Sequence, residues 1–467
     1  MVFSSAVFLL LFLPISLGLY YIAPKKCKNL ILLISSLIFY AWGEPVYILI
    51  MLFSTVFDYT NGILLERFEQ KGADKKRKAV LILSVVVNIG LLCFFKYTNF
   101  VLENISFLLS ISIPAVNVKL PIGISFYTFQ TLSYTIDVYR KKVKSQHNII
   151  NFGMYVSMFP QLIAGPIVRY ADIDAQINNR TIDFDKAYSG ICRFSQGLMK
   201  KVLLANSFGY IWDSLSAESQ SISTVSAFIG ALSFMFQIYF DFSGYSDMAI
   251  GLGRMFGFDY LENFNYPYES KSITEFWRRW HISLGSWFRE YLYIPLGGNR
   301  KGIPRQILNL FIVWFLTGLW HGAGWNFIVW GLYFFVLLVI EKLFLKKLLD
   351  KLPSFISRIY CLFAVLISWV IFASDSLSSA LTYLKSMFGA NSFANGGAFY
   401  IRSYWLLIIC GCIFSIHLPK LLFKKLMNKL PTRAQTLIGC IICFIACSIS
   451  LIMIINSSYN PFLYFRF

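Results

Sequence analysis

The stretch ILNLFIVWFLTGLWHGAGWNFIVWGLYFFVLLVI, residues 307–340, joins two strongly apolar runs through the short sequence His-Gly-Ala-Gly. The runs cover residues 307–320 and 325–340 and contain no charged side chain. Such runs are stable in a lipid bilayer as helices, because every backbone N–H and C=O group then finds a partner within the helix. The stretch therefore predicts two helices at membrane depth with a break at His321.

The composition extends this interpretation to the whole chain. Of its 467 residues, 57% are hydrophobic and only 14% are charged, whereas a soluble domain carries about 25% charged residues. A soluble globule of this composition would expose large apolar patches and aggregate. We therefore expect an all-α polytopic membrane protein in which residues 1–467 form a single integral-membrane domain. A disordered chain, a collagen-like rod and a disulfide-stapled secreted fold are excluded.

Apolar runs recur along the chain, but several are shorter than the roughly 20 residues that a helix needs to cross the hydrocarbon core. They cover residues 7–22, 30–42, 46–57, 79–95, 100–113, 122–138, 149–163, 225–242, 307–320, 325–340, 359–372, 404–416 and 437–455. A short helix at membrane depth is stable only when other protein surrounds it or when it lines a cavity. We predict about eleven transmembrane helices plus a few re-entrant or amphipathic helices.

Basic loops assign the two sides of the membrane, since Lys and Arg accumulate on the cytoplasmic side. The chain holds 42 Lys and Arg against 23 Asp and Glu, a net charge of +19. The basic clusters lie at residues 25–28, 67–78, 342–351 and 420–433. Placing them inside puts both the N-terminus and the C-terminus on the extracytoplasmic side of the cell membrane. We interpret the positive charge as this bias and not as a nucleic-acid-binding surface.

Residues 244–302 differ from the rest of the chain, because they mix Trp, Tyr, Arg, Glu and Asp and contain no long apolar run. This pattern predicts amphipathic helices and turns at the cytoplasmic face, with aromatic rings at the level of the lipid headgroups. Two interpretations stay open on these residues alone. The block is either a structural interfacial layer or the vestibule for an anionic substrate, whose phosphates would contact its arginines.

His321 is the most unusual of the four histidines. A helix that begins at residue 307 reaches it after about 21 Å, which is less than the roughly 30 Å of the hydrocarbon core. An ionisable side chain at that depth is costly and is a functional-site hypothesis by default. A neutral imidazole there can act as a general base, because the ordinary pKa of imidazole lies near working pH. The alternative is a histidine that only forms a hydrogen bond between helices.

Motifs of other enzyme classes are missing from the sequence. It contains no Gly-x-Ser-x-Gly turn, no Walker loop and no His-Glu-x-x-His motif. The sequence therefore does not support a serine hydrolase, an ATPase or a zinc protease. Cys440, Cys443 and Cys447 lie near one helix face, but Ile, Phe and Ala surround them. We interpret them as small apolar residues in lipid. No metal site and no bound cofactor is expected.

Four motifs, in this order, resemble the membrane-bound O-acyltransferase family, and within it the alginate O-acetyltransferase branch most. They are residues 237–265, 275–284 (Glu-Phe-Trp-Arg-Arg-Trp-His-Ile-Ser-Leu), 291–300 and 318–323 (Gly-Leu-Trp-His-Gly-Ala). The resemblance covers most of the chain. It implies a bundle of helices around a central funnel, with an acyl donor that arrives from the cytoplasm and an acyl group that leaves outward.

The resemblance also implies roles for individual residues. His321 corresponds to the catalytic histidine of the family, and His281 corresponds to its second frequent polar position. The expected acyl donor is a thioester such as acetyl-CoA, which would be a substrate and not a bound cofactor. Its anionic nucleotide would suit Arg278, Arg279 and Arg289 on the inner face.

The C-terminal segment, residues 456–467, ends in Phe-Leu-Tyr-Phe-Arg-Phe and is similar to an aromatic tail of related acyl-export systems. In those systems a tyrosine hydroxyl relays the acyl group to a partner outside the membrane, and Tyr464 is the corresponding residue here. An aromatic anchor at the membrane interface is an equally good interpretation of the tail.

The resemblance therefore implies an enzyme that moves an acyl group, expected to be acetyl, across the membrane for O-acetylation of an extracellular polysaccharide. Its expected partners are a separate extracytoplasmic acetyltransferase or export protein, the polysaccharide acceptor and membrane lipid. Two alternatives stay open: D-alanyl transfer to teichoic acid, and a polysaccharide transport or export subunit without catalysis of its own.

Overall fold

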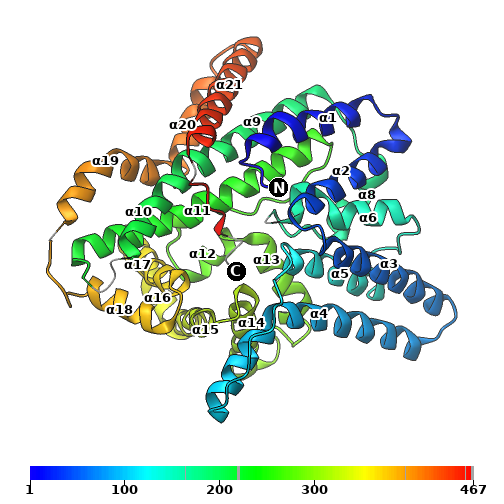
Figure 1. Cartoon of the computed structure of the whole chain (residues 1–467), viewed down its shortest axis with the longest axis horizontal. Coiled ribbons are helices and arrows are strands. Elements are labelled where there is room, and N and C mark those ends of the chain that lie inside the picture. Colours follow the sequence, from blue (N-terminus) through cyan, green and yellow to red (C-terminus); the bar gives the residue numbers. More distant parts are fainter. Residues whose placement is uncertain (164, 218–220, 395, 458, 464–467) are drawn as a thin grey trace. The chain divides into compact units, whose positions relative to one another are not determined.

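The computed structural model describes residues 1–163, 165–217, 221–394, 396–457 and 459–463. In this part of the chain every regular element is a helix, as Figure 1 shows, so the all-α class expected from the sequence is confirmed. The chain divides into two compact units, and each is described by itself. The first is formed by Met1–Phe194 and Met248–Leu261, the second by Ser195–Asp247 and Glu262–Phe467.

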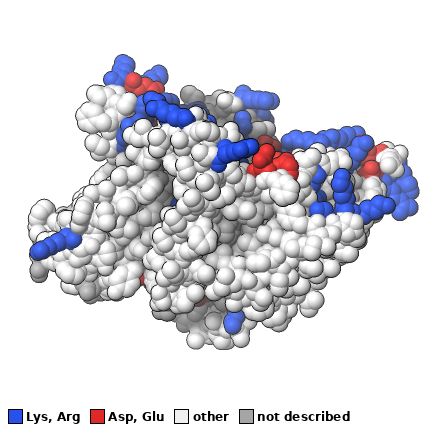
Figure 2. All heavy atoms as spheres, turned by 90° about the horizontal axis from the view of Figure 1, so that it is seen from above, with Lys and Arg blue, Asp and Glu red and all other residues white. Residues whose placement is uncertain are grey.

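Eight helical segments among the described residues are long and apolar enough to cross a membrane. They are α3 (Ile48–Gln70), α4 (Asp74–Leu109), α11 (Thr224–Met255), α14 (Gly302–His321), Trp325–Leu349, α17 (Ser354–Ala373), α19 (Gly397–Phe414) and α21 (Thr432–Asn456). On the face seen in Figure 2, Lys and Arg gather in clusters, and wide areas between them carry no charged side chain. The chain is thus a multi-pass membrane protein, as its composition predicts, while the number of about eleven crossings stays a prediction.

The remaining helices of the first unit are shorter. They are η1 (Phe8–Phe12), α1 (Leu13–Ile22), η2 (Lys25–Cys27), α2 (Lys28–Gly43), α5 (Ile124–Tyr139), α6 (Ile149–Ser157), α7 (Phe159–Leu162), α8 (Tyr170–Asn179) and the first part of α9 (Phe184–Met199). Helices α3, α4 and α5 pack together and bury the carboxylate of Asp58, which accepts hydrogen bonds from Ser84 (2.7 Å) and Asn88 (2.8 Å). These donors replace the water that the carboxylate loses on burial.

Two boundaries in the first unit differ from the sequence prediction. The single helix α4, which ends at Leu109, joins the run 79–95 to most of the run 100–113, although the two were predicted as separate. The residues between them include neither Gly nor Pro and do not interrupt a helix. Residues 149–163, predicted as one run, form the two helices α6 and α7. Pro160 explains the break, since it lacks an N–H group and its ring clashes with the carbonyl of the preceding turn.

The second unit adds further short helices. They are η3 (Lys200–Ala205), α10 (Asn206–Ser216), η4 (Pro267–Glu269), α12 (Ile273–Arg279), α13 (Ile282–Phe288), η5 (Arg289–Tyr293), α15 (Trp325–Ile340), η6 (Glu341–Leu345), α16 (Lys346–Leu349), α18 (Leu377–Met387) and α20 (Leu418–Met427). The buried carboxylate of Glu341 accepts hydrogen bonds from the N–H groups of Ile273 (2.6 Å) and Thr274 (2.9 Å). An acid inside an apolar stretch thus satisfies the free N–H groups at the start of α12.

Helices α14 and α15 pack with their backbones in contact. A methyl group on Gly318 of α14 would lie 2.5 Å from the carbonyl oxygen of Phe327, and Gly331 of α15 faces the carbonyl oxygen of Trp314 in the same way. Helix α14 ends at His321, and Gly322 continues in an extended conformation, so the predicted break is confirmed. The helix begins at Gly302 and not at residue 307, because a proline in its first turn is compatible with a helix start.

Candidate active site

His321 is the last residue of α14 and is buried, with 8% of its surface exposed. Its ring centre lies 4.9 Å from that of Trp330 and 5.3 Å from that of Phe372, and the rings are nearly perpendicular. Trp320, its neighbour in the chain, lies 5.0 Å away in a similar orientation. Edge-to-face contacts of this kind are favourable. Three aromatic rings therefore hold the imidazole in place and keep bulk water from it.

A small cavity opens beside this imidazole. Its volume is about 20 Å³, enough for one water-sized group. Its walls are the side chains of Ile238, Asp241, Phe242, Trp280, His321, Trp330, Trp369, Phe372 and Leu463, all in the second unit. Only two of these side chains, His321 and Asp241, can exchange a proton. The cavity thus combines aromatic and aliphatic walls with one imidazole and one carboxyl group.

Asp241 is paired with a buried cation. Its Oδ1 lies 2.8 Å from Nζ of Lys201, and the two side chains are only 4% and 3% exposed. Lys201 lies in η3, a π-helical turn between α9 and α10, and such turns are frequent at functional sites. A buried carboxylate is tolerated when a cation and hydrogen bonds compensate its charge. The pair therefore contributes polar atoms to one side of the cavity but no net charge.

The C-terminal tail reaches the same cavity. The N–H of Leu463 donates a hydrogen bond to Oδ2 of Asp241 (3.0 Å), and the carbonyl oxygen of Pro461 accepts one from Lys201. The hydroxyl of Tyr459 donates to Asp213 (2.6 Å). The Asp241–Lys201 pair therefore anchors the tail beside His321. Tyr464, the next residue in the chain, lies outside the described residues.

His281 lies between α12 and α13, is 2% exposed and has a left-handed backbone (φ 45°). Its Nδ1 is 3.2 Å from Oδ1 of Asn263. The amide of Asn263 is oriented by its other contacts, since Nδ2 donates to Ser246 (3.1 Å) and Oδ1 accepts from the N–H of Ser283 (3.2 Å). Nδ1 of His281 must then carry the proton, which assigns the tautomer from the hydrogen bonds.

This tautomer leaves Nε2 of His281 unprotonated, and that atom has no hydrogen-bond partner among the described residues. Burial lowers the pKa of His281 to about 3, so the imidazole is neutral at physiological pH. His281 does not line the cavity. Its ring packs on Phe242 (4.6 Å) and Trp320 (6.2 Å), and these rings separate it from His321 by one aromatic layer.

The three candidate arginines lie apart from the cavity walls. Arg279 forms an ion pair with Glu275 one helical turn earlier (2.8 Å). Arg278 and Arg289 are exposed, and neither has a carboxylate within 4.0 Å among the residues that the structure describes. Arg278 and Arg289 are therefore free of internal ion pairs, while the charge of Arg279 is already compensated.

Sequence reasoning missed the walls of the site. Trp330, Trp369 and Phe372 are ordinary members of apolar runs, and no local pattern distinguishes them from lipid-facing aromatic residues. Lys201 carried a usable signal, because a lysine directly before an apolar run is rarely buried without a partner. Asp241, an acid inside another apolar run, is the partner that the fold supplies.

Residues 45–383 match the model of the membrane-bound O-acyltransferase family, MBOAT, a range that includes both buried histidines and every cavity residue except Leu463. The chain belongs to the membrane-bound O-acyltransferase family. The resemblance inferred from the four motifs is confirmed, and His321 lies within the matched part of this MBOAT chain.

Three relatives of the MBOAT chain differ in their named reactions. The probable alginate O-acetylase AlgI of Pseudomonas aeruginosa is 45% identical over 393 residues, 83% of this chain and 75% of that protein. The peptidoglycan O-acetyltransferase of Helicobacter pylori is 35% identical over 426 residues, 84% and 80% of the two chains. The teichoic acid D-alanyltransferase of Bacillus subtilis is more distant, at 30% over 249 residues, 50% and 62% of the two chains. This MBOAT chain is thus an O-acyltransferase, and the interpretation as a transport subunit without catalysis is set aside.

Proposed function

We propose that this O-acyltransferase moves an acetyl group from cytoplasmic acetyl-CoA across the plasma membrane for O-acetylation of an extracellular polysaccharide. The observation that carries the proposal is the cavity of about 20 Å³ beside His321. A space that holds about one water-sized group has no room for a long acyl chain, so among acyl groups it favours the smallest. The names of the two relatives that align over more than four fifths of the chain also favour acetyl transfer.

In this proposal His321 is the general base. Its neutral imidazole takes the proton of an acceptor hydroxyl while the hydroxyl oxygen attacks the thioester carbonyl. The tetrahedral intermediate then expels the thiolate, which takes the proton from the imidazolium, and the acetyl ester remains on the acceptor. The aromatic walls support this chemistry, because they keep out water that would otherwise hydrolyse the thioester.

His281 has a different proposed task. Because its Nδ1 is bound to Asn263 and its ring packs on Phe242 and Trp320, it is placed to hold the wall of the cavity. We assign it as a positioning residue that acts through these two rings. These two rings would have to move aside before Nε2 of His281 could contact a substrate in the cavity.

The donor nucleotide is proposed to bind at Arg278 and Arg289. Both side chains are exposed and have no ion pair within the described chain, so their guanidinium groups can receive phosphate oxygens in a bidentate manner. Arg279 is proposed to contribute less, because Glu275 already compensates its charge. The cytoplasmic location of these residues is part of the proposal.

The acceptor hydroxyl is proposed to be that of Tyr464. The support is the position of Leu463, which lines the cavity of His321 and is bonded to Asp241. The acetyl group would form an ester with the tyrosine oxygen. An extracytoplasmic acetyltransferase would then transfer it to a polysaccharide hydroxyl and regenerate the phenol. This route requires both chain termini to be extracytoplasmic.

The proposed function is tested in cells. A deletion strain should lack O-acetyl groups on one surface glycan, as measured by mass spectrometry, and wild-type protein should restore them. His321→Ala should not restore them, whereas His147→Ala, which changes an exposed histidine paired with Glu66, should. Loss of D-alanyl esters with intact acetylation would contradict the proposal and favour D-alanyl transfer.

A further inference from the structure

A second and much larger cavity lies within the first unit. Its volume is about 1130 Å³. The end of α1, the start of α2, the end of α8 and the start of α9 surround it, together with the loop of residues 180–183. All residues that line it belong to the first unit. None of its lining residues lines the cavity beside His321.

Its lining is strongly basic. Four cations, Lys25, Lys26, Lys28 and Arg180, face one carboxylate, Asp183. None of the four has a carboxylate within 4.0 Å among the described residues. The pKa of Lys28 is lowered by burial and by repulsion from Arg180 and Lys25. The four positive charges therefore act on one another without internal compensation.

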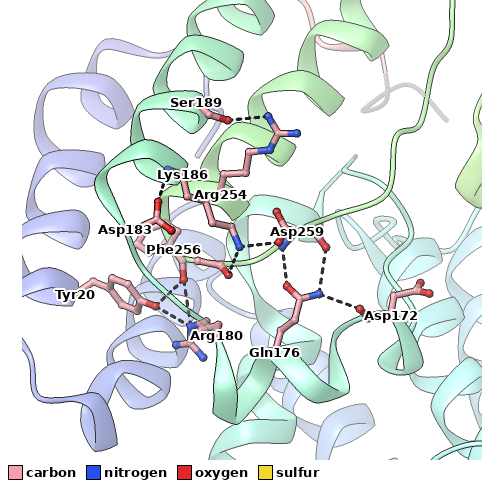
Figure 3. Close-up of polar contacts among 11 residues, drawn as sticks. Tyr20, Asp172, Gln176, Arg180, Asp183, Lys186, Ser189, Arg254, Phe256 and Asp259 are labelled. Carbon is pink, nitrogen blue, oxygen red and sulfur yellow. Dashed lines mark hydrogen bonds and ion pairs between the residues drawn. The ribbon is translucent and has the colours of Figure 1, made fainter. Parts of the chain in front are cut away.

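Two neighbouring cations outside the cavity have side-chain partners. Lys186 forms an ion pair with Asp259 (2.7 Å), and Arg254 donates a hydrogen bond to Ser189 (3.0 Å). Figure 3 shows both contacts. Lys186, which does not line the cavity, thus has a carboxylate partner, whereas the four cations that line the cavity have none within 4.0 Å among the described residues. An anionic ligand would supply the missing charge.

Arg180 is fixed in position by neutral groups. Its Nε donates to the hydroxyl of Tyr20 (2.8 Å) and to the carbonyl oxygen of Phe256 (3.2 Å), and Nη1 donates to the carbonyl oxygen of Ile177 (2.7 Å), as Figure 3 shows in part. Its guanidinium also lies 4.5 Å from the ring centre of Phe258. These contacts preorganise a cation without neutralising it, as a binding site for an anion requires.

The cavity also has an apolar side. Leu17, Tyr21, Phe184 and Ile191 contribute to its lining, and the side chain of Phe184 is 94% exposed. Apolar side chains beside lysines are typical of surfaces that meet lipid headgroups. The ligand should therefore combine a negative charge with an apolar part.

We propose that this cavity binds a phosphate ester, with the phosphate held by Lys25, Lys26, Lys28 and Arg180 and the organic part on the apolar side. Two sources carry this chemistry: an anionic phospholipid and a soluble nucleotide phosphate. The lysines act as point charges, and the fixed guanidinium offers a planar pair of donors. The proposal concerns the first unit alone and does not depend on the acyl-transfer reaction.

Native mass spectrometry of the purified full chain in a neutral detergent tests the proposal. The probes are phosphatidylglycerol, zwitterionic phosphatidylcholine and adenosine bisphosphate. Wild-type protein should retain either phosphatidylglycerol or adenosine bisphosphate in clear preference to phosphatidylcholine, and the probe retained identifies the source. Raising the salt concentration should weaken this binding, because screening reduces charge interactions.

Lys25→Gln/Lys26→Gln removes two exposed charges from the cavity, and Lys75→Gln/Lys78→Gln is the matched control, since both of its lysines are exposed and neither lines the cavity. The cavity variant should bind the retained probe on the order of tenfold more weakly, while the control binds it as wild type does. Both should unfold at the wild-type temperature without ligand. Equal binding by the two variants, or no preference of wild type for an anionic probe, overturns the proposal.

Discussion

The two buried histidines of the second unit differ in what their ring nitrogens can reach. His321 lines the cavity, whereas His281 is bound to Asn263 through Nδ1 and is covered by Phe242 and Trp320. General-base catalysis requires direct access to the proton that is removed. The geometry therefore supports the proposal that His321 is the general base and that His281 is a positioning residue.

The variant His281→Asn tests whether His281 is buried in its neutral form, through the pH dependence of stability. The folded protein keeps His281 neutral down to a pKa of about 3, whereas the unfolded chain takes up a proton below a pH of about 6.5. Acidification through this window therefore favours the unfolded state. Asn tolerates the left-handed backbone and removes the titrating ring. Between pH 7 and 5, wild type should lose about 2 kcal/mol more stability than the variant, measured by chemical or thermal unfolding.

Equal loss in both proteins would show that His281 is not buried in its neutral form. The pH profile of acyl transfer provides a second measurement, because a positioning residue changes the rate without moving the profile. A displaced profile in His281→Asn would instead assign proton transfer to His281.

We predict that removing one partner of the Asp241–Lys201 pair destabilises the protein more than removing both. Lys201→Met leaves the buried carboxylate without its cation and should destabilise the protein by about 3 to 5 kcal/mol. The double variant Lys201→Met/Asp241→Leu removes both charges and should recover most of the lost thermal stability. If the double variant is as unstable as the sum of the single variants, the two charges are not coupled as described.

At the level of elements, the contact between α14 and α15 sets the position of His321. Because Gly318 and Gly331 allow the two backbones to touch, the end of α14 lies against the start of α15, and Trp330 comes to lie against the imidazole. A side chain larger than hydrogen at either glycine would separate the helices. The precision of the site thus depends on residues that carry no functional group.

Gly331→Ala tests this contact. The added methyl group would meet the backbone of α14, so we expect a loss of about 1 to 3 kcal/mol in stability and a lower transfer rate. Gly90→Ala in α4 is the matched control, since a methyl group there would meet nothing within 4 Å, and it should leave stability unchanged or raise it by about 1 kcal/mol. Wild-type stability in Gly331→Ala would contradict the close packing.

Local signals predict elements better than they predict partners. The break after His321 is visible in the sequence, because glycines interrupt an apolar run there. The continuity of α4 and the break at Pro160 follow from the same kind of local signal, because Gly and Pro interrupt a helix and other residues do not. The capping of α12 by Glu341 has no such signal, since 68 residues separate the carboxylate from the N–H of Ile273.

At the level of the whole chain, the candidate site is assembled from segments far apart in sequence. Its histidine, His321, was predictable, because an ionisable residue between apolar runs stands out. Its walls were not, because Asp241, Trp369 and Leu463 reach the cavity from separate elements and only the fold brings them together. The meeting of Asp241 with the tail spans 222 residues, a contact that hydropathy and charge patterns do not contain.

Tyr464→Phe tests the proposed relay through the tail. The variant should fold and reach the membrane as wild type does but should leave the surface glycan without O-acetyl groups, because the acceptor hydroxyl is lost. Tyr459→Phe is the control, since it removes another tyrosine hydroxyl of the tail, one that donates to Asp213. Mass spectrometry of the glycan checks both variants, and normal acetylation with Tyr464→Phe would exclude the relay.

The role of His321 is decided by incubating purified protein with radiolabelled acetyl-CoA and measuring the label transferred to the chain or to an added glycan acceptor. Wild type and His147→Ala should transfer acetyl at similar rates. His321→Ala should transfer it at least about 100-fold more slowly, with an unchanged thermal unfolding midpoint. Transfer by a folded His321→Ala variant at the wild-type rate would contradict catalysis by this imidazole.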